Sequence, residues 1–300
     1  MINFSIIIAT YNRGKLLKET LNNLNDILQD KLFDNKNEII VINNNSTDDT
    51  EIILKEYSRK YSFIKYNNEY NQGLSYARNR GINEANNEIL IFMDDDIVVH
   101  TSWIDNILRG FKDLKIAIVG GKVLPYKIKV PPWLPQEYYF LASIFDLGEK
   151  RKKTRSIMGC NFAVRKKVLD EVGYFNVNLG RKGKQLLGGE ENDLCLRITK
   201  KGYEVIYEPN AIIYHKIEDK LNYNYILNNS YWVGVSEARL ELIQKKYIRF
   251  TLKYIRSLLF RNTLYWIRGK FAQTQEDSIQ YSIRRNYSNG YLKFWKKNNQ

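Results

Sequence analysis

The chain has 300 residues, of which 44% are hydrophobic, and its formal net charge is +14. This length allows one large core with an appendage or two domains, and the composition fits a globular protein. Two cysteines, Cys160 and Cys195, exclude a disulfide framework and favour a reducing cytoplasm. With no signal-peptide pattern and no apolar run near 18 residues, we expect no membrane span.

The positive charge is concentrated in the C-terminal part of the chain. Residues 216–300 contain 16 Lys or Arg and 6 Asp or Glu, whereas the first 215 residues are close to neutral. Such a basic segment suits an anionic partner, either a membrane surface or nucleic acid.

Strands and helices alternate along the first 121 residues. The predicted strands are 4–10, 38–42, 63–66, 89–92 and 116–121, with helical periodicity between the earlier ones and a helix at 102–111. Short links between such elements are typical of a parallel, doubly wound sheet flanked by helices. The sequence therefore predicts an α/β fold.

The pattern is looser in the following segment. Residues 122–156 read as an irregular insertion. After it we predict a strand at 158–165, a short helix near Lys167, a helix opened by Gly188 and Gly189, and short strands at 204–207 and 211–214. From residue 218 onward only helices rich in Tyr, Ile and Lys or Arg are expected. The predicted division is a catalytic domain at 1–217 and a helical region at 218–300.

Three consecutive carboxylates, Asp94, Asp95 and Asp96, follow the buried strand at 89–92. In open α/β sheets, ligands bind at the edge where such strands end. Carboxylates at this density suit a hard divalent cation such as Mg²⁺ or Mn²⁺. The alternative is an acidic turn that only caps the helix starting near Thr101.

Other polar loops belong to the same edge. Residues 10–13 and 43–49 follow the first two strands, and Arg78 lies early in the helix that leads to the acidic strand. Amides and hydroxyls suit a base and ribose, and an arginine suits a phosphate. The chain has neither a G-x-G-x-x-G after its first strand nor a Walker lysine motif, which argues against dehydrogenases and P-loop enzymes.

These motifs together resemble an inverting family 2 glycosyltransferase of the GT-A fold. The resemblance runs from about residue 3 to 216, and each motif alone is weak. The motifs are Ala9-Thr10-Tyr11-Asn12-Arg13, Asn43-Asn44-Asn45-Ser46-Thr47-Asp48, Asn71-Gln72-Gly73 with Ala77-Arg78-Asn79, Met93-Asp94-Asp95-Asp96, Gly159-Cys160-Asn161-Phe162-Ala163-Val164-Arg165, Gly189-Glu190-Glu191-Asn192-Asp193-Leu194 with Arg197, and His215.

The resemblance implies roles for individual residues. The nucleotide-sugar site would comprise Thr10, Tyr11, Asn12, Arg13, Asn43, Asn44, Arg78, Asp94 and Asp95. Asp96 would bind the divalent ion, Mn²⁺ or Mg²⁺, and His215 would complete its coordination; the alternative for His215 is an exposed structural histidine. Asp94 would face the ribose or the metal, and Asp95 would be dispensable for the metal. Gly159, Asn161, Gly189 and Asp193 would belong to the loop for the acceptor and the donor sugar.

Two positions depart from the family pattern. The usual Glu-Asp pair is Glu190-Glu191 here, so Glu191 would be the base for the acceptor hydroxyl and Glu190 would hydrogen-bond the donor sugar or the acceptor. The alternative is a set of first-turn acids favoured by the helix dipole. Asn43 stands where the family usually has Asp, which leaves the nucleotide open: UDP is the first choice, ahead of GDP and dTDP.

The C-terminal region contains an amphipathic pattern. Ile248, Leu252, Ile255 and Leu259 form an apolar stripe beside Lys246, Arg249, Lys253 and Arg256, with Tyr254, Tyr265 and Trp266 nearby. This pattern suits an anionic membrane face, and it equally suits a helix packed on the core. No aromatic–basic RNA motif or helix-turn-helix signature is present, so we expect no nucleic-acid partner.

The sequence therefore predicts a metal-dependent glycosyltransferase that uses a nucleotide-diphosphate donor. Its acceptor would be a lipid-linked or growing surface saccharide, reached from the cytoplasm at the inner face of the plasma membrane. The alternatives are a sugar nucleotidyltransferase, which lacks its triphosphate loop here, and an inactive nucleotide-sugar-binding or scaffold subunit.

Overall fold

The structure is a computed structural model that describes residues 2–32, 36–256 and 262–298. Its contacts divide the chain into two compact units. The first unit comprises Met1–Tyr126, Phe145–Asn178 and Glu190–Lys216, and the second comprises Lys127–Ile144, Leu179–Gly189 and Ile217–Gln300. The predicted domain boundary after residue 217 lies one residue from the boundary that the contacts place between Lys216 and Ile217. The segments Lys127–Ile144 and Leu179–Gly189 group with the C-terminal helices.

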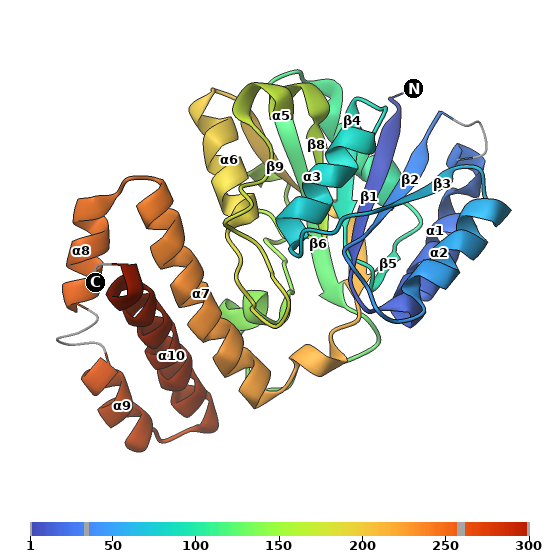
Figure 1. Cartoon of the computed structure of the whole chain (residues 1–300). Helices are drawn as coiled ribbons and strands as arrows, with labels where there is room; N and C mark the ends of the chain where they lie inside the picture. The colour runs from blue at the N-terminus through green and yellow to red at the C-terminus, as the bar shows by residue number, and fades with distance from the viewer. Residues whose placement is uncertain (1, 33–35, 257–261, 299–300) are drawn as a thin grey trace. The chain divides into compact units, whose positions relative to one another are not determined.

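Within the described residues, the first unit is built on a nine-stranded mixed sheet (Figure 1). The strands are β1 (Phe4–Thr10), β2 (Glu38–Asn43), β3 (Ile64–Asn68), β4 (Ile89–Met93), β5 (Ile97–Val99), β6 (Ile116–Pro125), β7 (Lys152–Lys153), β8 (Asn161–Arg165) and β9 (Glu204–His215). Their order is β3-β2-β1-β4-β8-β6-β9-β5, and β7 pairs with β9.

The two halves of this sheet differ in strand direction. Strands β1 to β4 are parallel, as predicted, whereas β8 runs antiparallel to both β4 and β6. One long strand, β9, replaces the two short strands expected at 204–207 and 211–214. The α/β architecture is confirmed, and the parallel part carries the polar loops to one edge.

Helices cover both faces of the sheet (Figure 1). They are α1 (Gly14–Leu32), α2 (Thr50–Lys60), α3 (Leu74–Glu84), α4 (Trp103–Arg109), the short 3-10 helix η1 (Gly110–Lys112), α5 (Lys166–Val172) and α6 (Glu190–Lys200). Successive strand side chains point to opposite faces. Ile6 and Ile8 therefore belong to the core that contains α1, α2 and α4, while Ile7 belongs to the core that contains α3, α5 and α6.

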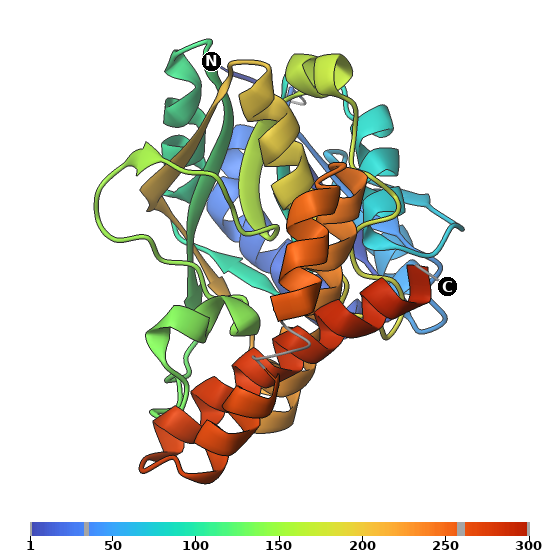
Figure 2. The same cartoon turned by 90° about the vertical axis from the view of Figure 1, so that its left-hand side faces the viewer.

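The second unit is helical. It contains the 3-10 helices η2 (Gln136–Ala142) and η3 (Glu218–Lys220) and the helices α7 (Tyr223–Ile243), α8 (Tyr247–Arg256), α9 (Asn262–Lys270) and α10 (Gln275–Asn298). Figure 2 shows α7 in orange and α10 in red beside each other. Their backbones approach closely, since a Cβ atom at Gly234 would overlap the carbonyl group of Tyr287, and one at Gly290 would overlap that of Tyr231.

The C-terminal helices predicted from sequence are thus present. Of the predicted stripe, Leu259 and the side chains of Ile248 and Arg249 lie outside the described residues. Among the helices that are described, none has the length and apolar character needed to cross a membrane.

Candidate active site

The acidic turn after β4 is held by α1 and by the loop after β1. Arg13 Nη1 lies 3.2 Å from Asp95 Oδ1 and 2.6 Å from Asp96 Oδ2. Thr10 Oγ1 donates a 2.7 Å hydrogen bond to Asp95 Oδ2. Burial, reinforced by the charge of Asp96, raises the pKa of Asp95 to about 7, although Arg13 acts in the opposite direction.

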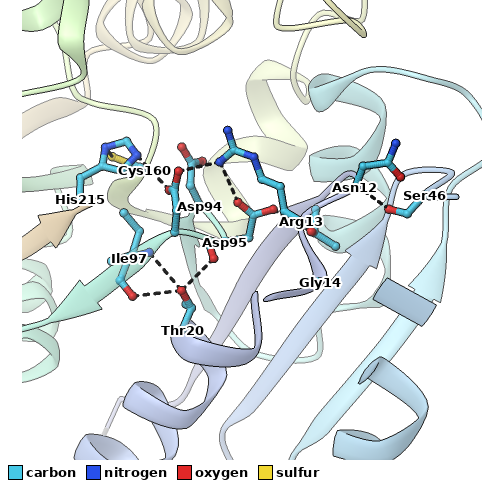
Figure 3. Close-up of polar contacts among 12 residues, drawn as sticks. Asn12, Arg13, Gly14, Thr20, Ser46, Asp94, Asp95, Ile97, Cys160 and His215 are labelled. Carbon is cyan, nitrogen blue, oxygen red and sulfur yellow. Dashed lines mark hydrogen bonds and ion pairs between the residues drawn. The ribbon is translucent and has the colours of Figure 1, made fainter. Parts of the chain in front are cut away.

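His215 reaches the acidic turn from the opposite side to Arg13 (Figure 3). Its Nε2 atom lies 2.9 Å from Asp96 Oδ1, and its side chain is 1% exposed. The antiparallel pairing of β5 with β9 places Ile97 opposite His215, so these two strands fix the position of His215 beside the acidic turn. The predicted alternative, an exposed histidine, is therefore wrong because His215 is buried against a carboxylate.

Asp94, Asp96 and His215 form a cluster that fits a metal ion. Each offers one ligand atom, and these atoms lie within 4.8 Å of one another. Asp94 is 36% exposed, so the cluster is open to solvent on the side of that carboxylate. Two carboxylate oxygens and one imidazole nitrogen are suitable ligands for a small divalent cation.

A second cluster forms around Arg78, which is buried. Arg78 Nη1 lies 3.2 Å from Glu190 Oε1 and 2.8 Å from Glu191 Oε1, and Nη2 donates a 2.9 Å hydrogen bond to the carbonyl oxygen of Gly159. A Cβ atom at position 159 would overlap Glu191, so this approach requires glycine. The same guanidinium group lies 3.9 Å from Asp94, which joins the two clusters.

The two glutamates of this cluster have different environments. The Glu190 side chain is 3% exposed, whereas that of Glu191 is 17% exposed. Burial, followed by the neighbouring charge of Glu191, raises the pKa of Glu190 to about 8, although Arg78 opposes this. The raised pKa favours the protonated form of Glu190, and the contact of Glu190 with a sugar remains a prediction. Glu191 is the more accessible carboxylate.

The loops predicted to bind the nucleotide converge as expected, and several of their side chains brace the backbone. Asn12 adopts a left-handed φ of 54° and its Oδ1 accepts a hydrogen bond from the Thr47 backbone. Asn43 Oδ1 accepts one from Ser46 N, and the amide of Asn44 bonds the 69–73 loop. Tyr11 is 40% exposed and is available to stack on a base.

Asn161, one of the residues predicted for the sugar loop, has structural partners of its own. Asn161 is completely buried, and its amide bonds Trp103 Nε1 and the carbonyl groups of Lys122 and Ala211. Both the oxygen and the nitrogen of this amide are therefore occupied within the protein, and Asn161 is not part of the proposed sugar site.

Two further residues predicted for the sugar loop, Gly189 and Asp193, lie at the start of α6. Asp193, in the first turn, pairs with Arg197 one turn later, with Arg197 Nε 2.8 Å from Asp193 Oδ2. Gly189 belongs to the second unit and has a φ of 96°, a conformation that favours glycine. Contact of either residue with a sugar remains a prediction.

Sequence reasoning missed two residues that support the acidic turn. Thr20 Oγ1 donates to the carbonyl oxygens of Asp95 and Ile97 and accepts from Ile97 N (Figure 3). Thr20 could have been found from the sequence, because it is a polar residue on the otherwise apolar buried face of α1. Cys160 Sγ lies 3.8 Å from His215 Nδ1, and no sequence signal linked these residues.

The two clusters provide complementary chemistry. The first presents carboxylates and an imidazole suited to a cation, which could neutralise a diphosphate. The second presents an accessible carboxylate suited to accept a proton. Because Arg78 contacts Asp94 as well as Glu191, the two functions are adjacent within the first unit.

The chain is similar to known glycosyltransferases. Residues 5–173 match the family described as "Glycosyl transferase family 2". A glucosyl-dolichyl phosphate glucuronosyltransferase of Haloferax volcanii is 25% identical over 80% of this chain and 77% of its own length. The glycosyltransferase AglE of the same organism is 25% identical over 94% of this chain and 85% of its own.

Solved structures share the fold at lower identity. The mannosyltransferase PcManGT from Pyrobaculum calidifontis, in complex with GDP-Man and Mn²⁺, has a TM-score of 0.67 at 16% identity, over 98% of this chain and 87% of its own. GalNAc-T7 with UDP, GalNAc and Mn²⁺ has a TM-score of 0.58 at 18% identity, over 79% of this chain and 51% of its own.

Proposed function

The chain belongs to glycosyl transferase family 2, and we propose that it moves a sugar from a nucleotide-diphosphate donor to an acceptor hydroxyl with inversion at the anomeric carbon. The observation that carries this proposal is the position of Arg78. Its guanidinium group lies 3.9 Å from Asp94 and 2.8 Å from Glu191, so the candidate metal cluster and the candidate base belong to one site.

Residues of the first cluster hold the leaving group. Asp96 and His215 are the proposed metal ligands, and Asp94 faces the metal or the ribose. A bound Mn²⁺ or Mg²⁺ would neutralise charge on the departing diphosphate. Tyr11 and the loop that contains Asn43 and Asn44 form the proposed base pocket, with UDP as the preferred nucleotide.

Residues of the second cluster activate the acceptor. Glu191 takes the proton from the acceptor hydroxyl as the oxygen attacks the anomeric carbon on the face opposite the diphosphate. Attack from that face inverts the configuration. Arg78 orients the Glu191 carboxylate, and Gly159 leaves the space that this carboxylate needs.

The proposed acceptor is a lipid-linked or growing surface saccharide at the inner face of the plasma membrane. The similarity to a glucosyl-dolichyl phosphate glucuronosyltransferase supports a lipid-linked acceptor. In the second unit, α8, α9 and the residue following α9 expose large apolar side chains: Leu252, Ile255, Leu264, Trp266, Ile267 and Phe271. Lys and Arg residues interleave with them, which suits an anionic lipid surface.

A donor screen tests the reaction. Thermal-shift titrations of UDP-, GDP- and dTDP-sugars, each with Mn²⁺ or Mg²⁺, identify the nucleotide by metal-dependent stabilisation. Transfer to a saccharide acceptor is then followed by NMR of the product's anomeric configuration. We expect an inverted product; a retained configuration, or binding without transfer to any saccharide or lipid-linked acceptor, would contradict the proposal.

A vesicle experiment tests the membrane contact separately. We expect the protein to sediment with anionic vesicles at low salt and not with zwitterionic ones. Phe271→Glu, which changes a side chain that is 80% exposed, should weaken sedimentation. Leu114→Glu is the matched control, because Leu114 is 78% exposed in the first unit. Equal loss in both variants would contradict the assignment of this surface.

A further inference from the structure

The second unit contains a pocket of about 210 Å³ that the proposed reaction does not use. Its lining comes from four segments: η2, α7, α9 and α10. Leu141 and Ile283 are buried apolar residues of this lining, and Val233 adds a third aliphatic side chain. The volume is below the roughly 300 Å³ of a drug-sized site, so it suits one portion of a larger ligand.

Two polar side chains of α10, those of Arg284 and Ser288, line the same pocket. Ser288 is 1% exposed, and its Oγ atom has no hydrogen-bond partner among the described residues. A buried hydroxyl without a partner carries a desolvation cost that a ligand oxygen can relieve. Ser230, another hydroxyl in the lining, already donates to the carbonyl oxygen of Leu227.

Arg284 supplies the charge. Its side chain is 42% exposed, and its Nε donates a 2.9 Å hydrogen bond to Tyr138 Oη. Glu137 lies 3.6 Å from Nη2 and is 55% exposed, and such exposed pairs contribute little. A phosphate can therefore replace Glu137 at this guanidinium group while the bond to Tyr138 is retained.

We propose that this pocket binds one anionic glycerolipid. The phosphate pairs with Arg284, an ester carbonyl accepts a hydrogen bond from Ser288, and the start of an acyl chain packs on Leu141, Val233 and Ile283. Residues 284 and 288 are one turn apart on α10, about 6 Å along the helix axis, so they lie on one face. This inference rests on the proposed membrane association and gives it a stoichiometric lipid site.

A soluble short-chain lipid tests the site without vesicles. Dihexanoyl phosphatidylglycerol, used below its micelle concentration, should bind the full-length protein at one equivalent in calorimetry, whereas inorganic phosphate should not. Ser288→Ala should weaken binding about three- to tenfold, because it removes one hydrogen bond. Arg284→Gln should weaken it about tenfold. Arg285→Gln, at the exposed neighbouring position, is the matched control and should bind within twofold of wild type.

Folding and function are monitored in the same variants. Ser288→Ala removes an unsatisfied hydroxyl, so its melting temperature should equal or exceed that of wild type. Metal-dependent nucleotide-sugar binding should be unchanged in all variants. No lipid binding, equal binding by all variants, or equal loss in Arg284→Gln and Arg285→Gln would overturn the lipid site. A wild-type protein that binds the lipid but transfers no sugar would instead contradict the proposed function.

Discussion

Two clusters of acids in the first unit are each paired with one arginine, yet their surroundings differ. In the first, Asp95 and Asp96 pair with Arg13, Asp96 also contacts His215, and Asp94 is 36% exposed. In the second, Glu190 and Glu191 pair with Arg78, and the Glu190 side chain is only 3% exposed.

We propose that this difference separates a metal site from a proton site. Two carboxylates beside an imidazole, open to solvent at Asp94, suit a divalent cation. In the second cluster, burial and the charge of Glu191 raise the pKa of Glu190 to about 8, which favours a proton on that carboxyl group. Glu191, the more exposed of the two, is the proposed carboxylate that accepts a proton from the acceptor.

The largest effect is expected at Asp96. Asp96→Ala removes the carboxylate that contacts both His215 and Arg13. We expect transfer to fall about ten-thousandfold, because metal stabilisation of the leaving group contributes several kcal/mol. Thermal shift with Mn²⁺ and the nucleotide should also disappear. Asp105→Asn, at a 53% exposed position paired with Lys31, is the control and should retain activity. Metal-dependent binding that survives in Asp96→Ala would contradict the metal site.

The next effect separates the two glutamates. Glu191→Gln should lower kcat by about a hundredfold to a thousandfold, because general-base catalysis contributes this much. Metal-dependent nucleotide binding should persist. Glu190→Gln should lower kcat less than about tenfold, since the amide resembles the protonated acid that the raised pKa of Glu190 favours. Equal losses in the two variants would contradict the division of roles.

These pairings mark the limit of prediction from sequence. The acidic triplet and the loops after β1 and β2 were predictable, because parallel strands end at one edge of a sheet. The pairing of Arg78 with Glu191 could not be predicted, because the two residues are 113 positions apart and side-chain pairing depends on tertiary packing. The three-residue strand β5, which orients His215, is too short to produce a periodic pattern.

A smaller effect is expected at the nitrogen ligand. His215→Gln should weaken Mn²⁺ binding about ten- to a hundredfold, and Mg²⁺ binding less, because imidazole is a better ligand for Mn²⁺ than for Mg²⁺. Metal titrations of nucleotide binding measure both. His100→Gln is the matched control, since His100 bonds Ser102 and is absent from the cluster. Equal effects on both metals would remove His215 from the proposed ligand set.

The smallest effect is the pH dependence of stability at Glu190. Its pKa is raised from 4.5 to about 8 on folding, mainly by burial. Below pH 4.5 the carboxyl group of Glu190 is protonated in both the folded and the unfolded protein. Between pH 4.5 and about 8 it is protonated only in the folded protein, so its contribution to the free energy of unfolding falls as pH rises. Glu190→Gln removes the dependence. Its melting temperature should match wild type at about pH 5 and exceed it by about 5 °C at about pH 8.5.

A surface variant shows whether this difference belongs to Glu190. Glu84→Gln changes a carboxylate that is 33% exposed and paired with Arg80 on α3. Its melting temperature should run parallel to that of wild type across the same pH range, because exposed pairs contribute little. If Glu190→Gln also runs parallel to wild type, the proton is not held at Glu190. The proposed contrast between a metal site and a proton site would then fail.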